Sequence, residues 1–131
     1  MRMSASELQY DQLQGALLTQ VPELLEPIEH AFGNDYDLKI ESPGAYPIFE
    51  DVVLDFLLKN LDSYQNGDLL TRLFDFFEKM ATSSDGNVTD LLRIAILESL
   101  VYRPEYYQRS KQYLGKKTAE FAELEGRAAH P

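Results

Sequence analysis

The 131-residue sequence contains no cysteine and no tryptophan, and its 12 basic residues are outnumbered by 22 acidic ones. Without cysteine, the chain cannot form a disulfide framework, a thiolate zinc site or a cysteine nucleophile. The formal net charge of −10 argues against a nucleic-acid-binding protein, because gripping phosphates requires Lys and Arg on one face. No apolar run approaches the roughly 18 residues of a membrane span, and residues 1–8 lack the apolar core of a signal peptide. We therefore expect a soluble, cytoplasmic protein without a membrane partner.

The length of the chain indicates one domain. A chain of this size buries roughly two-thirds of its unfolded surface, so it needs neither a disulfide nor a metal ion for stability. We expect a single helical domain over residues 1–125, followed by a flexible C-terminal tail at residues 126–131.

The negative charge is concentrated in the first half of the chain. Residues 1–68 carry 13 acidic and 3 basic residues, whereas residues 69–131 carry 9 of each. One interpretation is that the excess only promotes solubility. The other is that it forms a surface for a basic partner, because complementary charge speeds encounter and selects against acidic competitors.

The spacing of apolar residues is helical almost throughout, which predicts an all-α fold. We expect six to seven helices packed as antiparallel hairpins, with a short α-solenoid-like stack as one possible arrangement. The predicted helices span about 4–21, 22–32, 47–64, 68–82, 87–101, 104–114 and 118–125. Within the fourth helix, Phe74 and Phe77 share one face while Phe76 points to the other. This pattern predicts a central helix that is covered on both sides.

The only long irregular segment is residues 33–47, and long ordered loops are often functional. It contains Asp35-Tyr36-Asp37, which resembles the start of a calcium-binding loop. The glycine and glutamate required at positions six and twelve of such a loop are absent, which favours a polar turn and no metal site. Tyrosine is enriched at the centres of interfaces, and Tyr36 and Tyr46 flank the acidic loop residues.

The sequence contains no motif that indicates an enzyme or a cofactor. A glycine-rich phosphate loop, Gly-x-Ser-x-Gly and His-Glu-x-x-His are all absent. His30 follows Glu26 by one helical turn, as in a helix-surface pair. It is also a candidate general base, although no nearby residue in the sequence orients a nucleophile for it. We therefore predict a non-catalytic protein with no cofactor.

Several segments resemble a family of small bacterial all-helical domains of uncharacterised function. They are LLTRLFDFFEKMA at 69–81, ILE at 96–98, YLGKKT at 113–118, and the Pro-x-Phe-x-Asp pattern at 47–51. The resemblance covers about residues 22–118. Domains of this kind look similar to immunity-type proteins of bacterial polymorphic toxin systems. The resemblance therefore implies a helical fold and a toxin partner, and it implies no catalytic residue.

Three functions remain open from the sequence. The first is an immunity protein that binds and neutralises a cognate toxin with a basic contact surface. The second is a cytoplasmic adaptor or structural domain whose acidity serves solubility, and the third is a small-molecule-binding or hydrolytic enzyme that uses His30 with a loop carboxylate. For the first, the predicted partner-binding residues lie in the irregular segment and the helix after it: Asp35, Tyr36, Asp37, Glu41, Tyr46, Glu50, Asp51 and Asp55.

Overall fold

A computed structural model describes residues 8–33, 44–63 and 66–129 of the chain. Every regular element in these residues is helical, which confirms the predicted all-α class. The elements join into seven continuous helices within the described ranges. The first four are η1–α1 (Tyr10–Gln12, Leu13–Gln20), η2–α2 (Pro22–Leu24, Leu25–Phe32), α3–η3–α4 (Ala45–Ile48, Phe49–Val53, Leu54–Ser63) and α5 (Gly67–Ala81). The remaining three are α6–η4–α7 (Gly86–Leu91, Leu92–Leu97, Glu98–Val101), α8 (Pro104–Ser110) and α9 (Lys116–Ala129).

Proline and aspartate mark where several helices begin. Pro22 and Pro104 occupy the first positions of their helices. A backbone N–H at this position has no acceptor within the helix, so proline, which has no N–H, costs no hydrogen bond there. Pro27 lies in the first turn of α2 and is tolerated for the same reason. The Asp85 carboxylate accepts a hydrogen bond from the backbone N–H of Asn87 at 3.0 Å and so caps α6.

The observed helix ends differ from the predicted ones at several places. The third helix begins at Ala45 instead of Pro47. α8 ends at Ser110, short of the predicted end near residue 114, and α9 begins at Lys116 and continues to Ala129. The predicted start of the first helix, at Ser4 or Ser6, lies outside the described residues. These shifts fall at helix ends, and at the start of α9 the Glu78 carboxylate of α5 accepts hydrogen bonds from the backbone N–H groups of Lys117 and Thr118.

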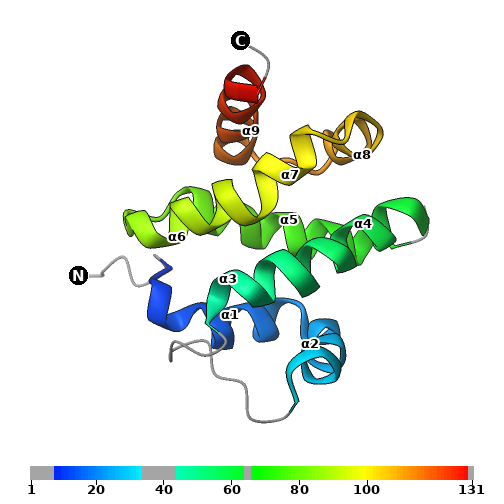
Figure 1. The fold of residues 1–131 in the computed structure, drawn as a ribbon, viewed down its shortest axis with the longest axis vertical. Helices are drawn as coiled ribbons and strands as arrows, with labels where there is room; N and C mark the ends of the chain where they lie inside the picture. Colours follow the sequence, from blue (N-terminus) through cyan, green and yellow to red (C-terminus); the bar gives the residue numbers. More distant parts are fainter. Residues whose placement is uncertain (1–7, 34–43, 64–65, 130–131) are drawn as a thin grey trace.

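The helix α5 lies at the centre of the fold, as its three phenylalanines predict (Figure 1). Phe74, Phe76 and Phe77 are all buried, although Phe76 points away from the other two. α5 contacts α1, α4, α6 and α9. Its two apolar faces therefore pack against different layers of one shared core.

The other helices are stacked on both sides of α5. α4 packs against α5, and α7 packs against α8, so the helices predicted to pair do contact each other. α1 and α2 lie at one end of the molecule and α9 lies at the other (Figure 1). Because α5 contacts both α1 and α9, the helices share a core and do not contact only successive neighbours, as the units of a solenoid would. Among the described helices, none is both long and apolar enough to cross a bilayer.

Candidate functional site: a groove between α2 and α4

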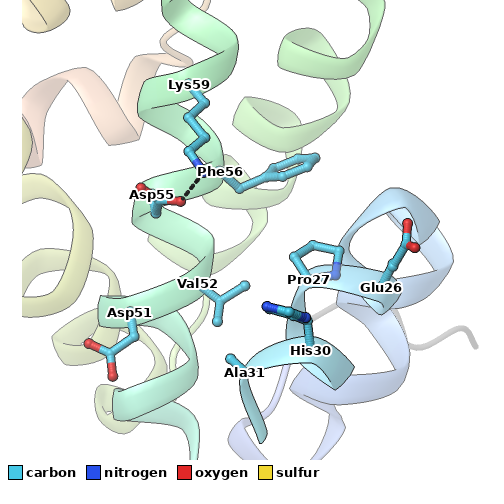
Figure 2. A pocket seen from close by; sticks show the side chains of 9 residues that line it. All are labelled: Glu26, Pro27, His30, Ala31, Asp51, Val52, Asp55, Phe56 and Lys59. Atoms are coloured by element: carbon cyan, nitrogen blue, oxygen red, sulfur yellow. Dashed lines mark ion pairs between the residues drawn. The ribbon is translucent and has the colours of Figure 1, made fainter. Parts of the chain in front are cut away.

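A surface groove of about 430 Å³ lies between α2 and the η3–α4 helix (Figure 2). We call it the α2–α4 groove. Its volume is at the small end of the range for ligand sites, roughly 300–1,000 Å³. The two helices contribute nine lining residues: Glu26, Pro27, His30, Ala31, Asp51, Val52, Asp55, Phe56 and Lys59.

The middle of the groove is apolar apart from the His30 imidazole, which lies beside Val52 (Figure 2). Pro27 and Ala31 are one helical turn apart on α2, and Val52 and Phe56 are one turn apart on the facing helix. Val52 is only 6% exposed, and Phe56 is half-buried against the core. Because Val52 and Phe56 are held in place by packing against the core, the η3–α4 side of this apolar surface is fixed before any partner arrives.

Acidic side chains lie on both sides of this apolar surface. Glu26 comes from α2, and Asp51 and Asp55 come from the opposite helix. The one lysine of the groove, Lys59, pairs with Asp55 at 3.0 Å, and both side chains are more than half exposed. An exposed pair of this kind is weak, at most about 1 kcal/mol, and exchanges readily with other partners. The lining therefore combines apolar side chains with three carboxylates, one lysine and the His30 imidazole, and the Asp51 carboxylate points away from the groove (Figure 2).

The segment η3 is π-helical, and it carries Asp51 and Val52. A π-helical turn contains more residues than an α-helical turn and changes which side chains face a neighbouring element. Such segments are frequent at functional sites. The second π-helical segment, η4, contacts η3 across the core.

His30 projects into the groove beside Val52, whereas Asp51 on the opposite helix points away from it (Figure 2). Asp55 is engaged by Lys59. In the described structure, His30 forms no hydrogen bond or ion pair with either aspartate. General base catalysis needs a histidine held by an orienting group and placed next to a nucleophile. The groove brings the three side chains to one site without that arrangement.

Two of the predicted partner-binding residues, Asp51 and Asp55, line the groove. Glu50 is exposed on the same helix but is not part of the lining. Four others lie outside the described residues: Asp35, Tyr36, Asp37 and Glu41.

Tyr46, the remaining predicted residue, is half-buried and packs against the core. Burial raises the pKa of its hydroxyl, and the negative charge of Asp90 and Glu50 adds to the effect while Arg93 opposes it. Tyr46 is not one of the residues that line the groove. Its main structural contribution is packing.

The sequence reasoning did not include the α2 side of the groove among the partner-binding residues. On this helix the sequence predicts Glu26 as a surface partner of His30 and His30 as a candidate general base, and it assigns no functional role to Pro27 or Ala31. The spacing of Glu26, His30 and Pro27 over about one turn was the available signal. This spacing does not indicate which face of the α3–η3–α4 helix packs beside α2.

Ion pairs outside the groove join helices that are distant in the sequence. Arg72 on α5 binds Glu23 at 2.7 Å, which joins α5 to η2, and it also binds Asp68 on its own helix at 3.1 Å. Arg93 on η4 binds Glu125 on α9 at 2.9 Å. No group of three or more His, Asp or Glu side chains in the described ranges is arranged to hold a metal ion.

Residues 15–125 match the family model described as "Domain of unknown function (DUF7674)". The chain belongs to this family. The match confirms the coarser part of the resemblance, a domain of unknown function that spans most of the chain. The link to immunity proteins stays a prediction. No curated protein and no solved structure matches the chain.

Proposed function

We propose that the protein is a non-catalytic binding module and that the α2–α4 groove binds a protein partner with a basic contact surface. The observation that carries the proposal is an apolar surface between two helices that both carry carboxylates, Glu26 on α2 and Asp51 and Asp55 on η3–α4. Apolar contacts supply affinity at the centre of an interface, and charged groups at its rim supply orientation and speed of encounter.

The charge distribution supports a basic partner. The groove lies entirely within residues 1–68, the segment that holds the whole negative excess of the chain. Exposed charges act over about one Debye length, which is roughly 8 Å at physiological salt. Glu26, Asp51 and Asp55 would therefore attract Lys and Arg side chains that approach the groove.

We propose further that the partner is a bacterial toxin that this protein neutralises, as an immunity protein does. This part rests on the sequence resemblance and on charge. A toxin that acts on nucleic acid needs a basic surface to bind phosphates. An acidic protein that covers such a surface would block the substrate without any catalysis of its own.

The proposal is tested by co-expression with the product of the reading frame immediately upstream, expressed from an inducible promoter. We expect this product to stop growth alone and to be neutralised by the wild-type protein. The double variant Asp51→Lys/Asp55→Lys should lose protection while retaining its helical circular dichroism spectrum and melting temperature.

A matched control is Glu120→Lys/Glu123→Lys, which makes the same change in charge on exposed positions of α9, at the opposite end of the molecule from α2. This variant should protect fully. Equal protection by both double variants would reject the groove as the contact surface. An upstream product that is harmless would reject the toxin partner and favour the adaptor interpretation.

A further inference from the structure

We propose that the α2–α4 groove receives a single amphipathic α-helix of its partner, with an apolar stripe flanked on both sides by Lys or Arg. This inference rests on the proposed function and specifies the element of the partner that binds. It follows from the shape of the groove, its length and the position of its charges.

The shape of the groove favours a helix over an extended segment. Extended peptides are commonly bound by pairing with the edge of a sheet, and the described parts of the chain contain no strand. Polyproline segments dock into grooves lined by several Tyr, Trp or Phe rings, whereas Phe56 is the one residue of these types in this lining. An apolar channel between two helices is the arrangement that accepts the apolar face of a third helix.

The length of the groove matches about two turns of helix. On the η3–α4 side, its lining runs from Asp51 to Lys59, and at 1.5 Å per residue this span is about 12 Å. Side chains at positions i, i+4 and i+7 of a partner helix span about 10 Å. Three consecutive apolar anchors therefore fit along Val52 and Phe56, facing Ala31.

The charges fix what must flank those anchors. Asp51 points away from the groove (Figure 2), whereas Glu26 lies on its α2 side and Asp55, paired with Lys59, lies on its η3–α4 side. A helix seated between Glu26 and Asp55 places its flanking side chains opposite these carboxylates. Lys or Arg there makes favourable pairs, whereas Glu or Asp would place like charges together.

The test uses a synthetic 18-residue helical peptide with Leu at the i, i+4 and i+7 positions and Lys on both flanks. It is titrated into the full-length, ¹⁵N-labelled protein at low salt. We expect backbone amide shifts confined to α2 and η3–α4, including those of Ala31, Val52 and Phe56. Two control peptides are a scrambled sequence of the same composition and a version with Glu in place of every Lys. Both should bind at least tenfold more weakly.

A protein variant, Ala31→Arg, places a long cationic side chain in the groove at an exposed helical position, so the fold should be retained. It should weaken binding of the Lys peptide at least tenfold. Gln112→Arg, which adds the same charge at an exposed position after α8, should change the affinity less than twofold.

No binding of the Lys peptide, equal binding of the scrambled peptide, or shifts outside the two groove helices would each overturn the inference. Its failure is separable from failure of the proposed function. If Asp51→Lys/Asp55→Lys abolishes toxin protection while Ala31→Arg retains it, the acidic face binds the toxin without a helix in the groove. If neither variant affects protection, both proposals are wrong.

Discussion

Replacement of Glu78 should loosen the attachment of α9 to the core. The Glu78 carboxylate, on α5, accepts hydrogen bonds from the backbone N–H groups of Lys117 at 3.0 Å and Thr118 at 2.9 Å. It also accepts one from the Thr118 hydroxyl at 2.8 Å, and Thr118 is completely buried. First-turn N–H groups have no partner within their own helix, and a carboxylate there is favoured by the helix dipole. Glu78 thus caps a helix that is 40 residues away in the sequence.

The expected cost of Glu78→Ala follows from these contacts. Losing a helix cap costs about 0.5–2 kcal/mol, and leaving the buried Thr118 hydroxyl without an acceptor costs about 1–3 kcal/mol. Because the hydroxyl can reorient, we expect a total loss of about 2–3 kcal/mol in the free energy of unfolding. For a chain of this length, that loss corresponds to a decrease of roughly 6–15 °C in melting temperature.

The effect should depend on pH. Burial by itself raises the pKa of the Glu78 carboxyl, but hydrogen bonds from Thr118 and Lys117 and the charge of Lys117 outweigh burial, so the net pKa is lowered. A carboxyl with a lowered pKa in the folded state stabilises the protein above its unfolded pKa, about 4.3 for Glu. This stabilisation is lost as the pH falls through the folded pKa.

The assay compares urea unfolding of the wild type and Glu78→Gln at about pH 7 and about pH 3. At about pH 7 the wild type should be more stable to unfolding than Glu78→Gln. At about pH 3 this difference in unfolding free energy should be smaller, because part of the Glu78 carboxyl is then protonated. Asp75→Asn is the control, because Asp75 is exposed on the same helix, and it should change stability by at most about 0.5 kcal/mol. If Glu78→Gln has no larger effect than this control at pH 7, or an equal effect at both pH values, the capping argument is refuted.

Two further substitutions test the local packing. Gly115→Ala should destabilise the protein by about 1–3 kcal/mol in thermal melts, because the added Cβ would overlap the Glu78 carboxylate. Gly86→Ala is the control and should not destabilise the protein in this way, because a Cβ at Gly86 meets open space. Similar losses of stability for both variants would argue against the overlap between a Cβ at residue 115 and Glu78. Asp85→Ala should cost about 1–2 kcal/mol, since Asp85 caps α6 and accepts the Tyr10 N–H at 2.9 Å. In Asp85→Ala, backbone amide hydrogen exchange should increase at the start of α6. Unchanged exchange there would contradict the role of Asp85 as a helix cap.

The all-helical fold and its central helix were predictable because they depend on patterns within single segments. The positions of Phe74, Phe76 and Phe77 show that both faces of one helix are apolar, and this indicates burial on both sides without knowledge of the neighbours. The exact helix ends were less predictable. The start of α9 depends on Glu78, a residue from another helix, so no local pattern around Lys116 contains that information.

The candidate site was predictable on one side only. Asp51 and Asp55 stand out in the sequence as an acidic cluster, and both line the groove. Pro27 and Ala31 carry no such signal, because their contribution arises only when α2 packs beside η3–α4. Tyr46 is of a residue type that is enriched at interfaces, yet it is half-buried against the core. Whether a side chain lines the groove or packs against the core depends on how two helices pack against each other. The amino-acid composition of each helix does not specify that packing.

The central claim, that the acidic groove binds a basic partner, is tested most directly by association rates. The upstream-encoded protein, made inactive, is mixed with the wild type or with Asp51→Lys/Asp55→Lys at about 0.01 M and about 1 M salt, where the Debye lengths are roughly 30 Å and 3 Å. We predict association at least about tenfold slower for the variant at low salt, with most of the difference lost at high salt. Equal association rates for the two proteins at low salt would contradict the claim.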